Sequence, residues 1–342
     1  MRVLLFLLLS LFMLSAFSAD NLLRWHDAQH FTVQASTPLK AKRAWKLCAL
    51  YPSLKDSYWL SLNYGMQEAA RRYGVDLKVL EAGGYSQLAT QQAQIDQCKQ
   101  WGAEAILLGS STTSFPDLQK QVASLPVIEL VNAIDAPQVK SRVGVPWFQM
   151  GYQPGRYLVQ WAHGKPLNVL LMPGPDNAGG SKEMVEGFRA AIAGSPVRIV
   201  DIALGDNDIE IQRNLLQEML ERHPEIDVVA GTAIAAEAAM GEGRNLKTPL
   251  TVVSFYLSHQ VYRGLKRGRV IMAASDQMVW QGELAVERAI RQLQGQSVSD
   301  NVSPPILVLT PKNADREHIR RSLSPGGFRP VYFYQHTSAA KK

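Results

Sequence analysis

Aromatic side chains recur where apolar, strand-like runs end, and these residues are the best suited to chemistry. Four clusters carry them: Asp56-Ser57-Tyr58-Trp59, Gly83-Gly84-Tyr85, Pro146-Trp147-Phe148 and Phe255-Tyr256. A fifth, Asp276-Gln277 with Trp280, follows another such run. The negative face of an aromatic ring attracts a cation by about 0.5–2 kcal/mol. One ring near a strand end is more often packing, but five recurrences favour a shared pocket for a positively charged group such as a methylated ammonium.

These clusters can meet only if the elements that carry them end at one edge of a sheet. Apolar runs alternate with amphipathic stretches, which is the pattern of an α/β protein. Strands are expected over 45–50, 77–81, 105–108, 127–131, 168–172, 197–203, 228–231, 250–255, 270–274 and 306–309. Helices are expected over 59–73, 87–101, 182–193, 209–223, 235–242 and 282–293. Strands separated by single helices predict parallel sheets, whose ligands bind at the carboxyl ends of the strands.

Catalytic and metal-binding patterns have little support. The seven His residues are far apart, and neither an HExxH motif nor a His/Cys/Asp cluster occurs. We therefore expect no enzyme, no metal and no cofactor. The glycine-rich loop over 173–182 lacks the GxxxxGK[ST] order of a phosphate cradle and predicts a turn between strand and helix. The one titratable pair that a hydrolase could use is Asp56 with Asp276.

The length and charge of the chain limit its domain organisation and the kinds of partner it can bind. The chain has 342 residues, which is enough for two lobes that each bury a core. It carries 36 Lys and Arg against 30 Asp and Glu, a net charge of +6, and the basic residues are scattered. No basic stripe is present, so no nucleic-acid partner is expected.

The first residues have the pattern of a secretory signal peptide. A basic start, an almost wholly apolar run over 3–14 and the small residues of 15–18 predict cleavage after Ser18. No later run approaches the roughly 20 apolar residues that span a bilayer. We expect signal peptide 1–18, a polar lead-in over 19–44, and an exported, periplasmic chain without direct membrane insertion.

The chain has two cysteines, Cys48 in a predicted strand and Cys98 in a predicted helix. An oxidising compartment would permit a disulfide between them. Two buried thiols are the alternative, because the sequence does not give the separation of the two residues.

Residues beside the first aromatic cluster carry a family resemblance: Leu50-Tyr51-Pro52-Ser53-Leu54, Tyr58-Trp59, Gly65, Ala69-Ala70 and Gly74. Glu186-Gly187-Phe188 and Ala274-Ser275-Asp276-Gln277 with Gly282 add to it. Over about 45–310 the chain resembles the type I periplasmic binding proteins, the ribose-binding and LacI-like superfamily. The resemblance implies two doubly wound parallel-sheet lobes, joined by three crossovers near 148, 257 and 302, with a ligand cleft between them. Lobe one would hold 45–148 plus 258–301, and lobe two with the C-terminal tail 149–257 plus 302–342.

Within this family the chain resembles the periplasmic sensors of trimethylamine N-oxide (TMAO), which act with a membrane histidine kinase. TMAO carries three methyl groups on a positive nitrogen and one negative oxygen, so rings would surround the methyl end and a Tyr or Trp donor would meet the oxygen. The sugar binders grip their ligand with an Arg where this chain has Lys182.

The resemblance implies specific site residues. Trp59, Trp147 and Tyr256 would be cage walls, and Tyr58 and Tyr85 would complete the pocket or hydrogen-bond in it. Asp56 would orient a ring hydroxyl or face the nitrogen, and its alternative role is a helix N-cap. Trp280 and Gln277 are weaker candidates, more in keeping with packing.

The expected function is periplasmic binding of TMAO, with its presence signalled to the periplasmic domain of a membrane sensor histidine kinase in two-component regulation of TMAO respiration. The alternative is a solute-binding protein that delivers a sugar or a methylated amine to an ABC-type permease.

Overall fold

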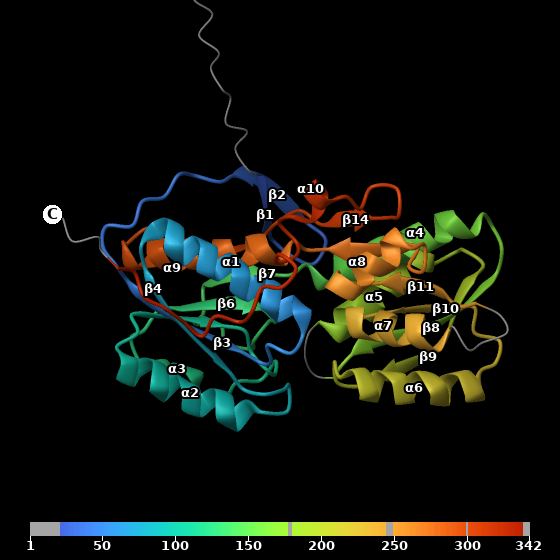
Figure 1. Cartoon of the computed structure of the whole chain (residues 1–342), viewed down its shortest axis with the longest axis horizontal. Coiled ribbons are helices and arrows are strands. Elements are labelled where there is room, and N and C mark those ends of the chain that lie inside the picture. Colours follow the sequence, from blue (N-terminus) through green and yellow to red (C-terminus); the bar gives the residue numbers. More distant parts are fainter. Residues whose placement is uncertain (1–20, 177–179, 244–248, 299, 338–342) are drawn as a thin grey trace, which may run out of the picture.

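The apolar runs of the N-terminal half form neighbouring strands of one sheet. In this computed structural model, which describes residues 21–176, 180–243, 249–298 and 300–337, two lobes lie side by side along the long axis (Figure 1). The signal peptide expected over 1–18 lies outside the described residues. The first lobe is built on strands in the order β15 (Phe333–Tyr334), β4 (Asp76–Glu81), β3 (Lys46–Tyr51), β5 (Ala105–Leu108), β6 (Val127–Val131), β7 (Ser141–Gly144), β13 (Asn301–Ser303), β1 (Asn21–Trp25) and β2 (Phe31–Ala35).

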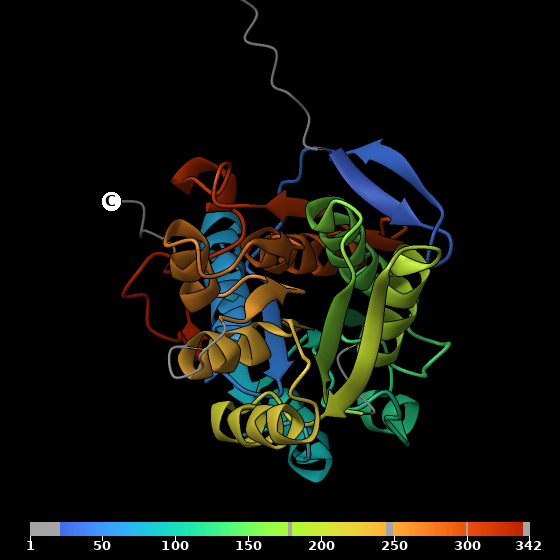
Figure 2. The same cartoon turned by 90° about the vertical axis from the view of Figure 1, so that its right-hand side faces the viewer.

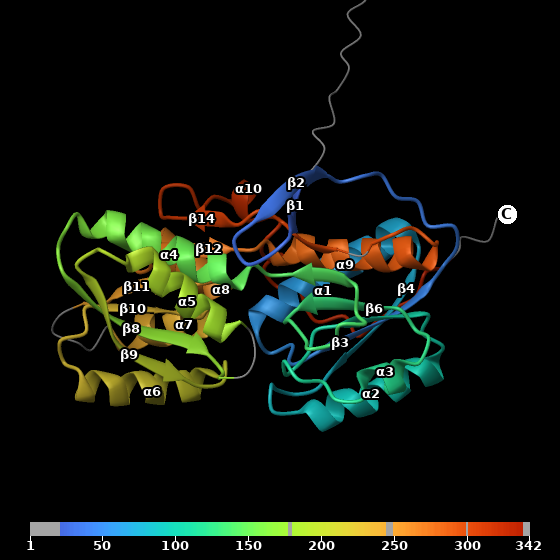
Figure 3. The same ribbon diagram turned by 180° about the vertical axis from the view of Figure 1, so that it is seen from behind.

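The central strands of this sheet run parallel to one another, in the order β4, β3, β5, β6, β7 and β13. The strands at both edges pair in the antiparallel direction. β15 pairs with β4 at one edge, and the hairpin β1–β2 pairs with β13 at the other. Figure 3 shows the hairpin from behind. The polar lead-in expected over 19–44 therefore contains two strands. Strands β7, β13 and β15 are also absent from the expected set, because they are too short to show a clear periodicity.

The second lobe is a second, mostly parallel sheet. Its order is β14 (Leu307–Leu309), β12 (Met272–Ser275), β11 (Thr251–Ser254), β10 (Val228–Gly231), β8 (Leu167–Gly174) and β9 (Val197–Leu204). All neighbours pair in parallel except the edge strand β14, which is antiparallel to β12. The α/β class with doubly wound parallel sheets is confirmed.

Helices cover both faces of each sheet. In the first lobe α1 (Ser57–Tyr73) packs with α9 (Met278–Leu293) on one face, and α2 (Leu88–Trp101) and α3 (Leu118–Val122) lie on the other. In the second lobe α4 (Trp147–Ala162) packs with α5 (Ser181–Ile192), opposite α6 (Ile209–Arg222), α7 (Ala233–Glu242) and α8 (His259–Lys266) (Figure 2). A short helix, α10 (Arg316–Ile319), follows β14. Among the described residues, no helix has the length and apolar character that crossing a membrane requires.

Two glycines explain why α1 and α9 can cross so closely. A Cβ on Gly65 would lie 1.9 Å from the carbonyl oxygen of Val279, and one on Gly282 would lie 2.2 Å from that of Leu62. No side chain fits at either distance, so glycine is required at both positions.

The structure differs from the expected lobe boundaries at the second crossing. Residues 258–301 are expected in lobe one, but α8 packs with α7, and β12 pairs with β11 in the second sheet. The chain returns to the first lobe at Asp276 and Gln277, between β12 and α9. The other crossings fall at 145–146 and 304–306, and a further passage takes the C-terminal segment from β14 back to β15 in the first sheet. Strand partners of this kind are not visible in sequence periodicity.

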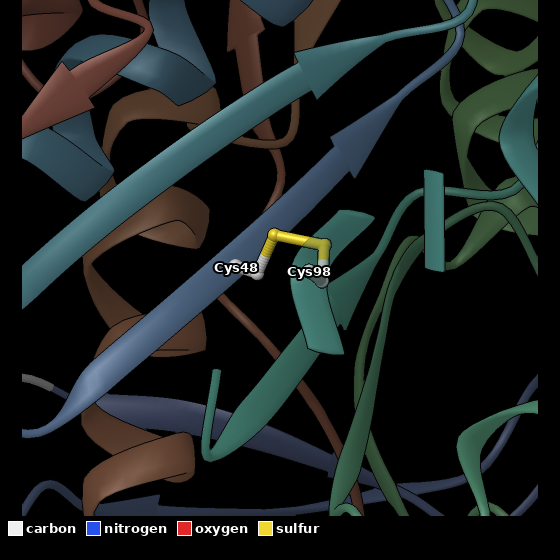
Figure 4. Close-up of a disulfide and its surroundings, with 2 residues drawn as sticks. All are labelled: Cys48 and Cys98. Atoms are coloured by element: carbon white, nitrogen blue, oxygen red, sulfur yellow. A yellow bond between two sulfur atoms is a disulfide. The ribbon is translucent and has the colours of Figure 1, made fainter. Parts of the chain in front are cut away.

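Cys48 and Cys98 form a disulfide, with an S–S distance of 2.02 Å. The bond joins β3 to α2 (Figure 4) and is completely buried in the apolar layer between the first sheet and α2. It therefore fixes α2 to the sheet.

Candidate functional site

A cavity lies where the carboxyl ends of strands from both sheets meet. It encloses about 290 Å³ of empty space, open solvent at its mouth included. The lining residues are Asp56, Tyr58, Tyr85, Val131, Asn132, Trp147, Pro173, Asn207, Thr232 and Tyr256. Each lies at or just after the carboxyl end of β3, β4, β6, β7, β8, β9, β10 or β11, as expected for the ligand site of parallel sheets.

Four of the expected aromatic residues line this cavity. Tyr58 begins α1, Tyr85 follows β4, Trp147 begins α4 and Tyr256 follows β11. The rings of Tyr58 and Tyr256 meet edge to face, with centroids 5.4 Å apart and planes at 76°. The two lobes thus contribute to one aromatic wall.

Trp59 lies behind this wall. It is only 1% exposed and is not among the residues that line the cavity. Its indole N–H donates to the hydroxyl of Tyr85 at 3.1 Å, and its ring packs 5.3 Å from that of Tyr51. Trp59 therefore supports Tyr85 from behind, and its role as a cage wall stays a prediction.

Trp147 packs against a glycine of its own lobe, in the loop that leads into α5. A Cβ on Gly180 would lie 2.0 Å from Cγ of Trp147, so the backbone of Gly180 lies directly against the indole ring. The indole N–H of Trp147 is buried and has no hydrogen-bond partner among the described residues. The carbonyl oxygen of the Asn207 side chain, also in the cavity lining, is likewise buried without a partner. A buried polar atom without a partner costs about 1–3 kcal/mol, which a bound ligand could offset.

Asp56 caps a helix and also lines the cavity. Its Oδ1 accepts from the backbone N–H of Tyr58 at 2.9 Å, so it is the N-cap of α1. It also lines the cavity. Burial raises the pKa of Asp56 from 3.8 to about 6, although the Tyr58 N–H lowers it and nearby Asp206 raises it.

The electrostatics of the cavity favour positive charge. Burial raises the pKa of Glu237, and the charge of Asp56 raises it further. Burial and the charge of Asp56 likewise hold the pKa of Tyr256 well above its usual range. Among the described residues that line the cavity, none is Lys, Arg or His. A cation bound there would relieve the repulsion between these acidic groups.

Five lining residues are absent from the expected set: Val131, Asn132, Pro173, Asn207 and Thr232. They are not aromatic, and their position just after strands is the one signal that could have found them. Val131 has a φ of +64°, a strained value for a β-branched residue, at the point where β6 enters the cavity.

The remaining candidates lie outside the cavity. Trp280 stacks under the guanidinium of Arg321, 4.4 Å from the ring centroid, and Gln277 donates to the carbonyl of Pro305. Lys182 is exposed on α5. Asp276 is buried behind Tyr58, so it does not form a catalytic pair with Asp56 in the cavity. Within the described ranges, no group of three or more His, Cys, Asp or Glu side chains could hold a metal ion.

Comparison with known proteins decides the family. Residues 44–337 match the family of periplasmic binding proteins and the sugar-binding domain of the LacI family. This protein is a member of that family. The predicted superfamily is thereby confirmed, and the two-lobed fold with a site at the strand ends is its expected architecture.

Relatives with much higher similarity are known. The periplasmic protein TorT of Escherichia coli K12 is 99% identical over the whole of both chains. Crystal structures of a TorS sensor domain–TorT complex, without ligand and with TMAO, match with 43% identity and TM-scores of 0.78 and 0.77, covering 84% of this chain and 100% and 99% of theirs. An ABC transporter solute-binding protein from Bradyrhizobium, with bound Bis-Tris, is 34% identical with a TM-score of 0.79, covering 92% of this chain and 98% of that one.

Proposed function

We propose that this protein is a periplasmic binding protein that holds TMAO in the aromatic cavity and signals its presence to the periplasmic domain of a membrane sensor histidine kinase. The full-length similarity to periplasmic TorT, and the solved TorS sensor domain–TorT complexes with and without TMAO, support this function. The single observation that carries it in this chain is the cavity wall, whose described residues include four aromatic rings and one buried carboxyl group but no basic side chain.

The two ends of TMAO find different partners in this arrangement. Tyr58, Tyr256, Tyr85 and Trp147 present rings to the methyl groups on the positive nitrogen, with Asp56 as the nearest negative charge. The unpartnered indole N–H of Trp147 donates to the N-oxide oxygen. A sugar would instead require paired polar groups around each of its hydroxyls, whereas four of the ten described lining residues are aromatic.

The division of the site between the two lobes gives the protein a way to signal. Tyr58 and Tyr85 belong to the first lobe, whereas Asn207, Thr232 and Tyr256 belong to the second, so an occupied cavity favours one arrangement of the lobes. A kinase domain that binds this arrangement more tightly reads the presence of ligand. Binding of this kind needs no bond to be made or broken, and we propose that the protein is not an enzyme.

Calorimetry of the purified mature protein with TMAO, trimethylamine, betaine and ribose tests the proposal. We expect TMAO to bind and ribose to give no heat. A response to ribose alone would contradict the function. The signalling step has its own test, because the kinase's periplasmic domain must raise TMAO affinity by the same factor by which TMAO raises the affinity between the two proteins. Equal TMAO affinities with and without that domain would refute the coupling.

The second candidate is a solute-binding protein for an ABC-type permease, favoured by the 34% identity to such a protein. It predicts TMAO or methylated-amine uptake that is lost when the protein is removed from cells. Uptake that is unaffected, together with a lost transcriptional response to TMAO, would exclude it.

A further inference from the structure

Asp276 is a buried carboxyl group that the ligand site does not use directly. It lies at the second crossing, between the end of β12 and the start of α9, and its exposed fraction is 0%. Its Oδ2 accepts from the hydroxyl of Tyr58 at 2.5 Å. Among the described residues, its Oδ1 has no hydrogen-bond partner, and no Lys, Arg or His side chain forms an ion pair with it. Burial raises the pKa of Asp276, and the hydrogen bond from Tyr58 lowers it.

The hydrogen bond determines what Tyr58 presents to the cavity. Because the hydroxyl proton of Tyr58 points to Asp276, this hydroxyl is not available as a donor to a ligand oxygen. Tyr58 therefore contributes its ring. The ring is held from two further sides by Tyr256, 5.4 Å away, and Trp59, 5.8 Å away.

The carboxyl group of Asp276 also couples this wall to the charge of a ligand. A hydrogen bond to an ionised acceptor is roughly twice as strong as one between neutral groups, and it increases the electron density of the phenol ring. The negative face of that ring is the part of Tyr58 that attracts a cation. Burial disfavours the ionised form of Asp276 and raises its pKa, whereas a cation in the cavity favours the ionised form, because a nearby opposite charge lowers the pKa of a carboxyl group.

The crossing itself is well fixed. Gln277 has a φ of +60°, and its side-chain amide donates to the carbonyl of Pro305 at 2.7 Å, in the neighbouring crossing. The hydroxyl of Ser275 donates to that of Ser322 at 2.7 Å. Asp276 is thus held in place from both sides and can serve as a rigid anchor for Tyr58.

We propose that Asp276 is a positioning and specificity-determining residue of the cavity: it holds the ring of Tyr58 as a wall and makes the site prefer a positively charged nitrogen over an uncharged group of the same shape. The inference rests on the proposed function, since it assumes that the aromatic cavity is the ligand site.

The test compares three ligands of similar shape: TMAO, tetramethylammonium and uncharged tert-butanol. Asp276→Asn keeps an acceptor for Tyr58 and removes the charge. We expect this variant to bind TMAO and tetramethylammonium about tenfold more weakly, while its affinity for tert-butanol changes by less than about threefold. Tyr58→Phe removes the anchored hydroxyl but keeps the ring, and we expect a severalfold loss of TMAO affinity.

The chain offers a matched control. The hydroxyl of Tyr73 donates to Oε1 of Glu287 at 2.7 Å, again between α1 and α9, but neither residue lines the cavity. Glu287→Gln removes a similar carboxylate from a similar pair, and we expect unchanged affinity for all three ligands. Thermal unfolding of each variant shows whether it is folded. If Asp276→Asn does not fold, Tyr58→Phe serves as the test.

The outcomes separate cleanly. An Asp276→Asn variant that binds all three ligands as the wild type does, or that loses all three by one common factor, would overturn the inference, as would unchanged TMAO affinity in Tyr58→Phe. Wild-type protein that binds tetramethylammonium but not TMAO would overturn only the proposed function. Wild-type protein that binds neither cationic ligand would overturn both.

Discussion

The indole N–H of Trp59 donates to the hydroxyl of Tyr85 at 3.1 Å, and this bond links a fully buried ring to the wall of the ligand cavity. Trp59 cannot shift away from it, because a glycine faces the far end of its ring. A Cβ on Gly109 would lie 2.5 Å from Cη2 and Cζ3 of Trp59. The orientation of Tyr85 is therefore set by packing deep in the first lobe.

Replacing Trp59 should affect both stability and binding. Trp59→Phe leaves a space in the core and removes the donor to Tyr85, so we expect a loss of about 2 kcal/mol in the free energy of unfolding and a severalfold weaker TMAO affinity. Denaturant unfolding and calorimetry measure the two effects. Tyr85→Phe is the companion variant, and if Trp59 acts through the Tyr85 hydroxyl, the double variant should bind no more weakly than Trp59→Phe alone.

The backbone of Gly180 should be as important as the ring that it touches. Gly180→Ala places a methyl group against Trp147 at a φ of +69°, and we expect it to displace the indole and weaken TMAO binding more than tenfold. Gly194→Ala is the matched control, since its φ is +73° but no atom lies within 4 Å of the added Cβ. We expect the control to lose about 1 kcal/mol of stability with normal affinity. Equal affinities in the two variants would refute the contact's role.

Titration of Asp56 should make binding depend on pH. With a pKa of about 6, Asp56 is mostly ionised at pH 7 and mostly protonated at pH 5, so TMAO affinity should fall by about tenfold between these values if the ligand requires the carboxylate. Calorimetry across this range measures the effect, and Asp56→Asn should abolish the pH dependence. A wild-type affinity that is flat with pH would show that the ligand nitrogen does not sense Asp56.

Protonation of Asp56 at low pH has the opposite effect on the stability of the ligand-free fold: it stabilises the fold. The pKa of Asp56 is raised in the folded protein, so the folded state prefers the protonated carboxyl. Its contribution to the stability of the ligand-free protein is therefore present below about pH 4 and is lost as the pH rises through about 6. Unfolding of wild type and Asp56→Asn over this range, without ligand, should show the difference between them growing toward low pH in favour of the wild type.

The disulfide should support stability without contributing to binding. It closes a loop of 50 residues, for which chain entropy predicts about 4 kcal/mol of stabilisation. Cys48→Ala with Cys98→Ala should lower the unfolding free energy by about this amount. Because neither residue lines the cavity, the TMAO affinity of the folded variant should stay within about twofold of wild type. A large loss of affinity would show that the cavity depends on the position of α2.

Sequence patterns predict those elements of this protein that have a regular apolar periodicity. The central parallel strands and most of the long helices follow from apolar runs and helical periodicity, and the cavity aromatics Tyr58, Tyr85 and Tyr256 follow from their place after strands. Helix α4 is missed because it contains Pro154 together with two glycines, which weakens a helical pattern. The sequence does not distinguish the places of Tyr58 and Trp59: adjacent residues on a helix point about 100° apart, so Tyr58 lines the cavity while Trp59 lies behind it.

Long-range partners set the limit of such predictions. The assignment of β12 to the second sheet depends on pairing with β11 and β14, and nothing local to residues 272–275 identifies these partners. The same holds for Asp276, whose partner Tyr58 is 218 residues away. Polar lining residues such as Asn207 and Thr232 resemble any other loop or cap residue until the two lobes are brought together.

The hairpin at the edge of the first sheet gives the lobe an order of assembly. β1 has its partner in β13, and the indole N–H of Trp25 donates to the hydroxyl of Ser303, 278 residues later in the chain. The opposite edge, β15, pairs with β4 across a similar distance. The inner strands β4, β3, β5, β6 and β7 can therefore pair early, because they come from one contiguous stretch of sequence. Neither edge of the sheet can be completed until residues beyond 300 are available. Until then this half-built sheet exposes open strand edges, which makes the unfinished chain, rather than the finished lobe, the state most prone to aggregation.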